Sequence, residues 1–548
     1  MASVSAHVAH ALSAHLEHVF GVMGNGNAAL LDALDRTPTR YTALRHEAGG
    51  VVAADAYFRA SGRLAAATAT YGAGFTNALT ALTESRQARI PVLLVVGDAP
   101  TTGARPWDVD QAAMAAAAGV PTFTVGREDA AATTVRAIEH ALAHRTAVVL
   151  AIPYDLATVD AGPYPSAEPP SISLPAPLSP DAAALDAVAA LLASARHPFL
   201  LAGRGAWLAN AGEALGRLAA ATGAMTASTT LARGIFPDAR HDLGVTGGFG
   251  QERAMELVRE ADVAVVFGAS LNQFTMRFGG LFAPGTRVVQ VDLSPQPTAA
   301  AVTDFVAGDA GLAASGLADR LEARGGMDSG WRETIDIVPL RRHHPGDGIA
   351  PDGRLDPRSV AARLAELLPE DRVVVSDGGH FIGWANMYWP VASPDRMVMI
   401  GTAFQSIGLG LPSIAGAAAA KPESTVVLTT GDGGALMALA DLESAVRTAG
   451  GRGIAVVWND AAYSAEVNLY GLKGYAEAPM LIPETDFAAL GNAVGAEGVV
   501  VRELADLDRL ETWATRPADE RRFLLLDCRI SGRVIAPYQH EIISVNSR

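Results

Sequence analysis

Short apolar runs alternate with alanine-rich stretches along most of the chain, and this alternation limits how the chain folds more than any other feature. Residues 92–97 (VLLVVG) and 263–267 (VAVVF) are two such runs, each long enough for one buried strand. The stretches between the runs are long enough for one helix each. A strand–helix–strand order of this kind is typical of parallel βαβ units. We therefore predict an α/β protein made of open, doubly wound parallel sheets.

Two irregular passages divide the chain of 548 residues, which is longer than one hydrophobic core usually serves. Residues 162–180 hold seven prolines in nineteen residues, and residues 341–354 are polar and contain proline and glycine. We interpret both passages as linkers. Three domains result, 1–162, 181–342 and 355–548. Strands are expected at 64–70, 92–97, 147–152, 197–202, 263–267, 287–291, 372–376, 425–430 and 454–458, and a helix is expected at 358–368.

Composition and charge narrow the classes of function. The formal net charge is −16 and no run of Lys or Arg is present, which argues against nucleic acid or an anionic membrane as a partner. The one cysteine, Cys528, lies in the apolar run 523–528 and is expected to be a buried strand residue rather than a catalytic group. A lone cysteine cannot form a disulfide within the chain, no stretch is apolar enough to span a membrane, and the first residues lack the pattern of a signal peptide. We expect a cytoplasmic protein.

The most specific pattern is a glycine-rich turn, Gly431-Asp432-Gly433-Gly434, placed directly after the apolar run TVVLTT. Asn459 ends the next apolar run, 27 residues after Asp432. Because this interval fits one helix and one strand, both side chains are expected at the same carboxyl edge of a parallel sheet, where ligands bind. A carboxylate, an amide oxygen and a backbone carbonyl are ligands that suit Mg²⁺. A glycine-rich turn beside an unrelated asparagine is the alternative.

This pattern resembles the metal motif of the thiamine-diphosphate-dependent enzymes, in which GDG is followed by Asn. The resemblance implies three oxygen ligands for Mg²⁺, from Asp432, Asn459 and the backbone carbonyl of Ala461. The metal would bind the diphosphate of the cofactor at a helix N-terminus. The resemblance also places four further residues at the cofactor, which are Gly431, Gly433, Gly434 and Tyr463.

A second pattern lies in the first domain, where Arg45-His46-Glu47 opens a helical stretch. It is similar to the RHE segment of acetolactate synthases and their relatives. That similarity implies that Glu47 hydrogen-bonds N1′ of the aminopyrimidine and favours the imino form, which removes the proton from C2 of the thiazolium. Without the resemblance, a Glu at a helix start is more often a first-turn charge or a capping group.

Four further segments carry the resemblance across the chain. Residues 21–27 (GVMGNGN) look like the G-x-P-G opening of the family, with Met23 in place of proline, and residues 70–77 (TYGAGFTN) look like the turn that approaches the cofactor. In residues 406–412 (SIGLGLP), Ile407 would prop thiamine in its bent shape; an ordinary core residue is the alternative. In residues 377–381 (DGGHF), His380 would contact the diphosphate; a loop histidine is the alternative. The cofactor-binding residues expected from these segments are Gly24, Thr70, Gly72, Asn77, Gly379, His380 and Ile407.

Two residues bear on the reaction. Decarboxylases of the family often have Asp or Ser at the position of Asn25, and an amide cannot serve as an acid or base there. Gln111 falls near a glutamine that faces the substrate in acetolactate synthases; a glutamine on a helix surface is the alternative. We therefore expect decarboxylation of a 2-oxo acid followed by carboligation to a second carbonyl. The alternatives are a non-oxidative decarboxylase, a lyase or hydrolase of a diketone or acyloin, and a cofactor-binding protein without turnover, although the last would need neither Glu47 nor the metal pair.

The middle domain and the assembly complete the set of expectations. Gly203-Arg204-Gly205 follows a predicted strand. The pattern occurs in relatives that bind FAD and in others that bind no nucleotide, so folding of the domain is the simpler interpretation and FAD is not expected. The resemblance also implies a homodimer or homotetramer in which the first domain of one subunit faces the third domain of its partner.

Overall fold

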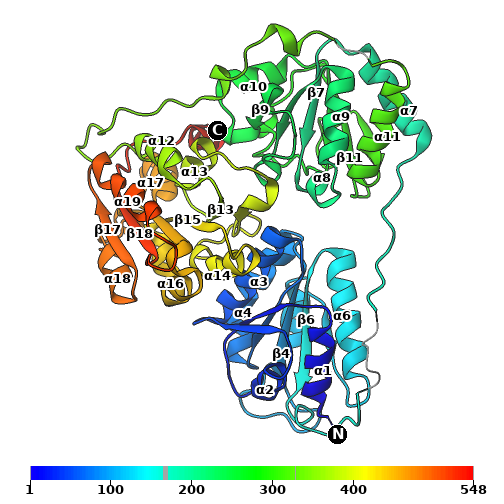
Figure 1. The fold of residues 1–548 in the computed structure, drawn as a ribbon, viewed down its shortest axis with the longest axis vertical. Coiled ribbons are helices and arrows are strands. Elements are labelled where there is room, and N and C mark those ends of the chain that lie inside the picture. Colours follow the sequence, from blue (N-terminus) through cyan, green and yellow to red (C-terminus); the bar gives the residue numbers. More distant parts are fainter. Residues whose placement is uncertain (1, 165–170, 327–328, 547–548) are drawn as a thin grey trace.

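The computed structural model describes residues 2–164, 171–326 and 329–546. It contains three six-stranded sheets, and all their strand pairs are parallel. Figure 1 shows one sheet in each of three lobes, blue to cyan, green, and yellow to red along the chain. The predicted fold class is therefore confirmed. The predicted domain boundaries stay a prediction, and residues 165–170 of the first predicted linker lie outside the described residues.

The first sheet has the strand order β2-β1-β3-β4-β6-β5. Its strands are β1 (His18–Gly21), β2 (Arg40–Ala43), β3 (Ala66–Ala69), β4 (Val92–Asp98), β5 (Thr122–Thr124) and β6 (Ala147–Pro153). Its helices are α1 (Val4–Ser13), α2 (Ala28–Leu34), α3 (Glu47–Ser61), α4 (Ala73–Gln87), α5 (Gln111–Ala117) and α6 (Ala130–His144). The long apolar runs form the buried central strands, as predicted.

The middle sheet has the order β12-β11-β10-β7-β8-β9. Its strands are β7 (Pro198–Ala202), β8 (Met225–Ser228), β9 (Asp242–Val245), β10 (Val263–Phe267), β11 (Arg287–Asp292) and β12 (Asp304–Ala307). Its helices are α7 (Ala182–Ser194), α8 (Arg204–Leu208), α9 (Gly212–Thr222), α10 (Glu252–Arg259) and α11 (Ala310–Glu322). A Cβ atom on Gly203 or Gly205 would lie within 3 Å of the backbone of Gly268. This close approach of two strand ends accounts for both glycines without a nucleotide.

The third sheet has the order β14-β13-β15-β16-β18-β17, the same topology as the first. Its strands are β13 (Arg372–Ser376), β14 (Met397–Met399), β15 (Thr425–Gly431), β16 (Gly453–Asn459), β17 (Glu497–Val501) and β18 (Leu524–Arg529). Its helices are α12 (Pro357–Leu367), α13 (Ile382–Tyr388), α14 (Gly410–Ala420), α15 (Asp432–Met437), α16 (Leu442–Ala449), α17 (Ser464–Tyr470), α18 (Phe487–Ala493), α19 (Arg509–Thr515) and α20 (Pro537–Asn546). Cys528 is a buried residue of β18, as predicted.

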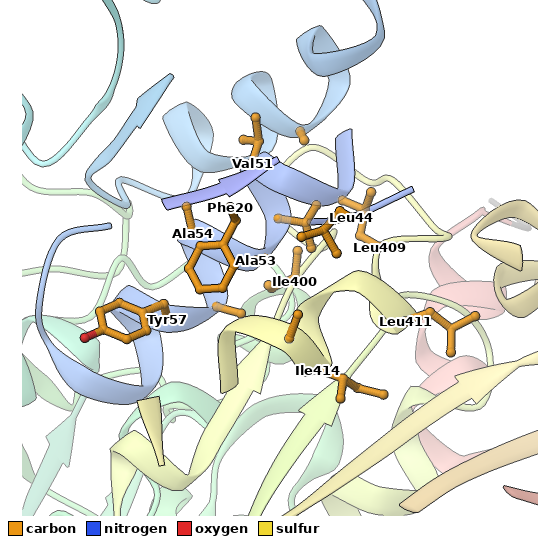
Figure 2. Packing of buried hydrophobic residues seen from close by; sticks show 14 of the residues in the cluster. Phe20, Leu44, Val51, Ala53, Ala54, Tyr57, Ile400, Leu409, Leu411 and Ile414 are labelled. Carbon is orange, nitrogen blue, oxygen red and sulfur yellow. The ribbon is translucent and has the colours of Figure 1, made fainter. Parts of the chain in front are cut away.

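The first and third domains share one hydrophobic core, built where α3 packs against α14. Figure 2 shows α3, which carries Ala53 and Tyr57, against α14, which carries Ile414, and these residues belong to one hydrophobic cluster. A Cβ atom on Gly416 would lie only 1.9 Å from the carbonyl oxygen of Ala53, so glycine is required for the two helices to approach this closely. A Cβ atom on Gly49 would lie 3.2 Å from Cβ of Pro412, at the start of α14. Residue 49 therefore lies opposite residue 412, and residue 53 lies opposite residue 416. Because both numbers rise together, the two helices run in the same direction and begin at the same end of the interface.

Among the described residues, no helix combines the length and the apolar character that a membrane span requires.

Candidate active site

The carboxyl edge of the first sheet is built around two turns that touch each other. The backbone N–H of Gly26 donates to Oγ1 of Thr70 (2.9 Å), and the N–H of Gly24 donates to Oδ1 of Asn27 (2.8 Å). A Cβ atom on Gly24 would lie 2.8 Å from Cβ of Thr70. The structure therefore brings the predicted residues Gly24 and Thr70 together, and Asn27, which the sequence did not single out, holds their turn from a buried position.

Glu47 is the first residue of α3, but it does not cap the helix. The cap is His46, whose Nδ1 accepts from the N–H of Ala48. The Glu47 carboxylate turns instead toward α4, where its Oε2 accepts from Nδ2 of Asn77 (3.0 Å) and its Oε1 lies near Gly74. Two of the predicted site residues, Glu47 and Asn77, are therefore in direct contact. In the single chain Glu47 is only half-buried, so full burial of its carboxylate would need a further surface.

Gly72 begins the turn into α4 with φ +63° and ψ −110°, a conformation that favours glycine. Its N–H donates to Oε1 of Gln111 (2.6 Å), and Nε2 of Gln111 donates to the carbonyl of Gly97 (3.0 Å) and to Oδ1 of Asp98 (3.1 Å). Gln111 is buried, so its alternative interpretation as a surface glutamine is wrong. Both polar atoms of its side chain are hydrogen-bonded to other residues of the chain. Its contact with substrate stays a prediction.

Asn25 lies at the exposed side of the same edge. Its Nδ2 donates to the hydroxyl oxygen of Tyr71 (2.8 Å). The Tyr71 ring is covered by the guanidinium of Arg105, 4.1 Å from the ring centroid, and this guanidinium is paired with Asp108. The sequence offered no proton-donating group near Asn25, and the structure places the Tyr71 hydroxyl there.

Asp432 occupies the first position of α15, at the carboxyl edge of the third sheet. Its Oδ1 accepts from the N–H of Gly433 and its Oδ2 from the N–H of Ala461, both at 2.8 Å. Burial, together with the nearby carboxylate of Asp460, raises the pKa of Asp432 to about 7. Two buried carboxylates close together repel each other, and a cation beside them would favour their ionised forms.

Asn459 ends β16 and is fully buried. Its Nδ2 donates to Oδ1 of Asp527 (2.8 Å) and to the carbonyl of Thr485 (3.0 Å), which fixes the amide orientation. Its Oδ1 is buried and has no hydrogen-bond partner among the described residues. A buried, unpaired amide oxygen is costly unless something binds it, and an oxygen-preferring cation such as Mg²⁺ fits this donor.

The third predicted metal ligand is the carbonyl of Ala461, which has φ +63° and so turns the chain sharply after β16. This carbonyl accepts from the N–H of Ile482 (2.8 Å). A carbonyl oxygen has two lone pairs, so one remains for a metal. The structure thus gathers Asp432, Ala461 and Asn459 at one sheet edge, linked by the bond between Ala461 and Asp432.

The glycines of the third domain are required by side chains of the same site. A Cβ atom would lie 2.5 Å from the ring of Tyr463 at Gly433, 2.7 Å from Oδ2 of Asp377 at Gly434, and 2.9 Å from the ring of Phe381 at Gly431. Gly379 has φ +135° and also lies against the Phe381 ring. These predicted residues are therefore neighbours, and a larger residue at any of them would displace a side chain of the site.

His380 is buried, and burial lowers its pKa to about 4. Its Nε2 is buried without a hydrogen-bond partner in the described part of the chain. The backbone carbonyl of His380 accepts from the hydroxyl of Tyr538 (2.6 Å). A neutral imidazole with a free ring nitrogen could bind a phosphate oxygen as an N–H donor, but not as a cation.

Ile407 is half-exposed and lies outside the hydrophobic clusters of the described residues, so its alternative interpretation as a core residue is wrong. The residues that follow Ile407 are held by Asp377, which is fully buried. The Asp377 carboxylate accepts from the N–H groups of Gly408 and Leu409 and from the hydroxyl of Thr430. Burial raises the pKa of Asp377. In the sequence Asp377 was noted only as the first residue of the 377–381 motif. Its role in holding residues 408 and 409 was not predicted.

Three family models match the chain and follow its three sheets. They describe thiamine pyrophosphate enzymes: the N-terminal TPP-binding domain matches residues 2–135, the central domain residues 185–317, and the C-terminal TPP-binding domain residues 377–528. The chain belongs to the thiamine-diphosphate-dependent (thiamine pyrophosphate) enzymes.

Curated relatives extend the similarity over most of the chain. The large subunit of acetolactate synthase isozyme 2 from Escherichia coli is 30% identical, over 80% of this chain and 80% of its own. Sulfoacetaldehyde acetyltransferase from Rhodobacter capsulatus is 28% identical, over 96% of this chain and 94% of its own. Acetolactate synthase from Mycobacterium avium is 28% identical, over 88% of this chain and 80% of its own. The chain is thus an enzyme of this family, similar to enzymes with two different names.

Proposed function

We propose that the protein is a thiamine-diphosphate- and Mg²⁺-dependent carboligase, which decarboxylates a 2-oxo acid and joins the remaining acyl unit to a second carbonyl compound. The observation that carries the cofactor part is the unpaired Oδ1 of Asn459 beside Asp432, at the sheet edge where the diphosphate would lie. Asn25 supports the reaction part, because an amide at that position cannot protonate the reacting carbon. The names of the relatives, acetolactate synthase and acetyltransferase, agree with acyl transfer.

Oxygen atoms of Asp432, Asn459 and Ala461 would hold Mg²⁺, and the metal would neutralise the diphosphate. His380 would donate to a phosphate oxygen through its free ring nitrogen. Thiamine diphosphate, when bound, supplies a nucleophilic carbon and a thiazolium ring that accepts the electron pair of the bond that breaks. The protein supplies the binding groups, their orientation and the exclusion of water.

Glu47 would hold a proton at N1′ of the aminopyrimidine. Asn77 orients the carboxylate for this task, since its Nδ2 occupies one carboxylate oxygen and leaves the other free. Gln111 fixes the turn at Gly72, two residues before Gly74, which lies near the same carboxylate. Ile407, half-exposed on its loop, would contact the ring system of the cofactor from the third domain.

Non-oxidative decarboxylation is a second candidate, and one specific observation favours it. The hydroxyl of Tyr71 is hydrogen-bonded to Asn25 and could donate the proton that decarboxylases add to the reacting carbon. Cleavage of a diketone or acyloin would use the same groups with a different substrate.

We also propose that the active enzyme is a homodimer or larger homo-oligomer with shared sites. Within one chain, α3 and α14 lie side by side and run in the same direction. The site edges of the first and third sheets therefore do not face each other across these two helices. Glu47 is half-exposed and Asn77 is exposed. The third domain of a partner would cover this edge and exclude water from the reacting groups.

The reaction is tested with purified protein, thiamine diphosphate, Mg²⁺ and a panel of 2-oxo acids. Each acid is supplied alone and with a second carbonyl compound, including sulfoacetaldehyde, and CO₂ and carbon products are measured. A carboligase should release CO₂ and form a coupled product. Release of a simple aldehyde in every case would indicate a decarboxylase. Cleavage of a diketone without CO₂ would indicate a lyase or hydrolase, and cofactor binding without any turnover would indicate a binding protein.

A further inference from the structure

Glu84, in the second half of α4, is a carboxylate without a role in the site described so far. It is 1% exposed, and glutamate is almost never fully buried unless it is paired. It lies seven residues after Asn77, which is two helical turns, so both side chains project from the same face of α4. One end of this face contacts Glu47 through Asn77.

The other end of this face contacts the third domain. Oε2 of Glu84 accepts from the backbone N–H of Phe404 (2.7 Å), and its Oε1 lies 3.4 Å from the N–H of Ala403. These residues are about 320 positions away in the sequence. A carboxylate that accepts from two successive backbone N–H groups binds a turn more strongly than a neutral acceptor would.

The bound turn belongs to the loop of residues 401–408, which follows β14 and carries Ile407. The loop is tight: the N–H of Ser406 donates to the carbonyl of Gly401 (2.7 Å), and Gln405 has φ +62°, which is rare for a residue other than glycine. Such a conformation persists only when its surroundings hold it. Asp377 holds the far end of the loop at Gly408, and Glu84 is the matching carboxylate at the near end.

Arg59 of α3 completes the attachment. Its Nη1 donates to the carbonyl of Met399, the last residue of β14 (2.8 Å), and its Nη2 lies 3.7 Å from Oε1 of Glu84. Asp55 neutralises the guanidinium within the same helix. The N-terminal domain therefore holds both the strand end that enters the loop and the first turn of the loop, through side chains that are all buried.

We propose that Glu84 is a positioning residue that holds the 401–408 loop, and with it Ile407, in the shape that receives the cofactor. The inference rests on the proposed function, because the contact of Ile407 with the cofactor belongs to that proposal. Among the described residues, the polar contacts of the Glu84 carboxylate are with the loop and with Arg59. The simpler interpretation is that Glu84 is an attachment between two domains like any other.

Variant Glu84→Gln separates the two interpretations, because it keeps the size of the side chain and removes its charge. Glu541→Gln is the matched control: Glu541 pairs with Arg277 and also joins two domains, but far along the chain from this loop. Backbone hydrogen exchange of the full chain without added cofactor is measured first, and the affinity for thiamine diphosphate with Mg²⁺ is measured by calorimetry.

For Glu84→Gln we expect exchange in residues 402–406 to accelerate about tenfold or more while the sheets keep their protection, and cofactor affinity to fall about tenfold. The control should change neither quantity. Unchanged exchange at 402–406 would overturn the inference, and so would acceleration spread over both domains in both variants, which would indicate a plain attachment. Faster exchange with unchanged cofactor affinity would overturn the link to the cofactor.

If the wild-type protein itself bound no thiamine diphosphate, the proposed function would fail, whereas the exchange result would still decide whether Glu84 holds the loop. Should Glu84→Gln not fold, Glu84→Asp takes its place. This variant keeps the charge but has a shorter reach, and the same acceleration is expected at 402–406.

Discussion

Glu47 is placed by its neighbours in a way that a helix-start glutamate does not need for folding. His46 already caps α3, so the carboxylate of Glu47 is free for another task. Asn77 binds one of its oxygens from the next helix, and Gly74 leaves room beside the other. A side chain that helps neither the cap nor the core, but is held in one orientation, is a candidate for catalysis.

Changing Glu47→Gln should leave the fold intact and slow the exchange of the C2 proton of bound thiamine diphosphate at least about a hundredfold, the scale of a positioned acid–base group. The exchange is followed by NMR after acid quench, and turnover should fall with it. Glu128→Gln, an exposed change in the same domain, serves as the control. Exchange at nearly the wild-type rate in Glu47→Gln would show that another group activates the cofactor.

The other residue-scale feature is the pair Asp432 and Asn459. Their contacts are arranged so that one amide oxygen remains unpaired in a buried place, which a folding role alone would not produce. Asp527 uses its own carboxylate to orient the amide of Asn459. The site is therefore prepared for a ligand that accepts electron pairs.

Variant Asp432→Ala should lose Mg²⁺-dependent binding of thiamine diphosphate, because the diphosphate would face a site that lacks an anionic metal ligand. Calorimetry with and without Mg²⁺ measures this directly. Asp371→Asn, an exposed change on the same domain, should bind as wild type does. An unchanged affinity in Asp432→Ala would mean that the metal site lies elsewhere.

At the scale of elements, the packing of α3 on α14 fixes how the first and third domains meet. Gly416 lets the carbonyl of Ala53 approach to a distance that no Cβ would permit. Both N-termini then lie at one end, next to the two site edges. The interface thus positions α3, with Glu47 at its start, against the loop that precedes α14.

The substitution Gly416→Val should lower the free energy of unfolding by about 2 kcal/mol or more, because overpacking this tight interface forces α3 and α14 apart. Denaturant unfolding followed by tryptophan fluorescence measures the change. Gly471→Ala is the control, because its added methyl would meet only the flexible side chain of Glu477. Equal midpoints for the two variants would show that the interface tolerates separation.

The sequence predicted the elements that carry long apolar runs, and β10 and β13 have the bounds expected for them. It missed short strands such as β2 and β14, at sheet edges, since three or four residues give no periodicity. Site residues inside local motifs were also predictable, as Asp432 shows. The contact between Glu84 and Phe404 was not, because no pattern within either segment records a partner about 320 residues away.

At the scale of the whole molecule, apolar side chains remain exposed close to both site edges. Met437, at the end of α15, is 58% exposed, and Phe404, in the loop held by Glu84, is 45% exposed. Met23 is exposed beside the turn that contains Gly24. Large apolar side chains gathered near a half-open site are typical of a surface that another subunit covers.

The most direct test of the account is complementation between two inactive chains. Glu47→Gln and Asp432→Ala chains carry different affinity tags, are co-expressed, and the heterodimer is purified by both tags in turn. If each site takes Glu47 from one chain and Asp432 from the other, one of the two sites in the heterodimer is intact and about half of the wild-type activity returns. Each variant homodimer should stay inactive. A verified heterodimer without activity, or a fully active monomer in sedimentation, would contradict a site shared between two chains.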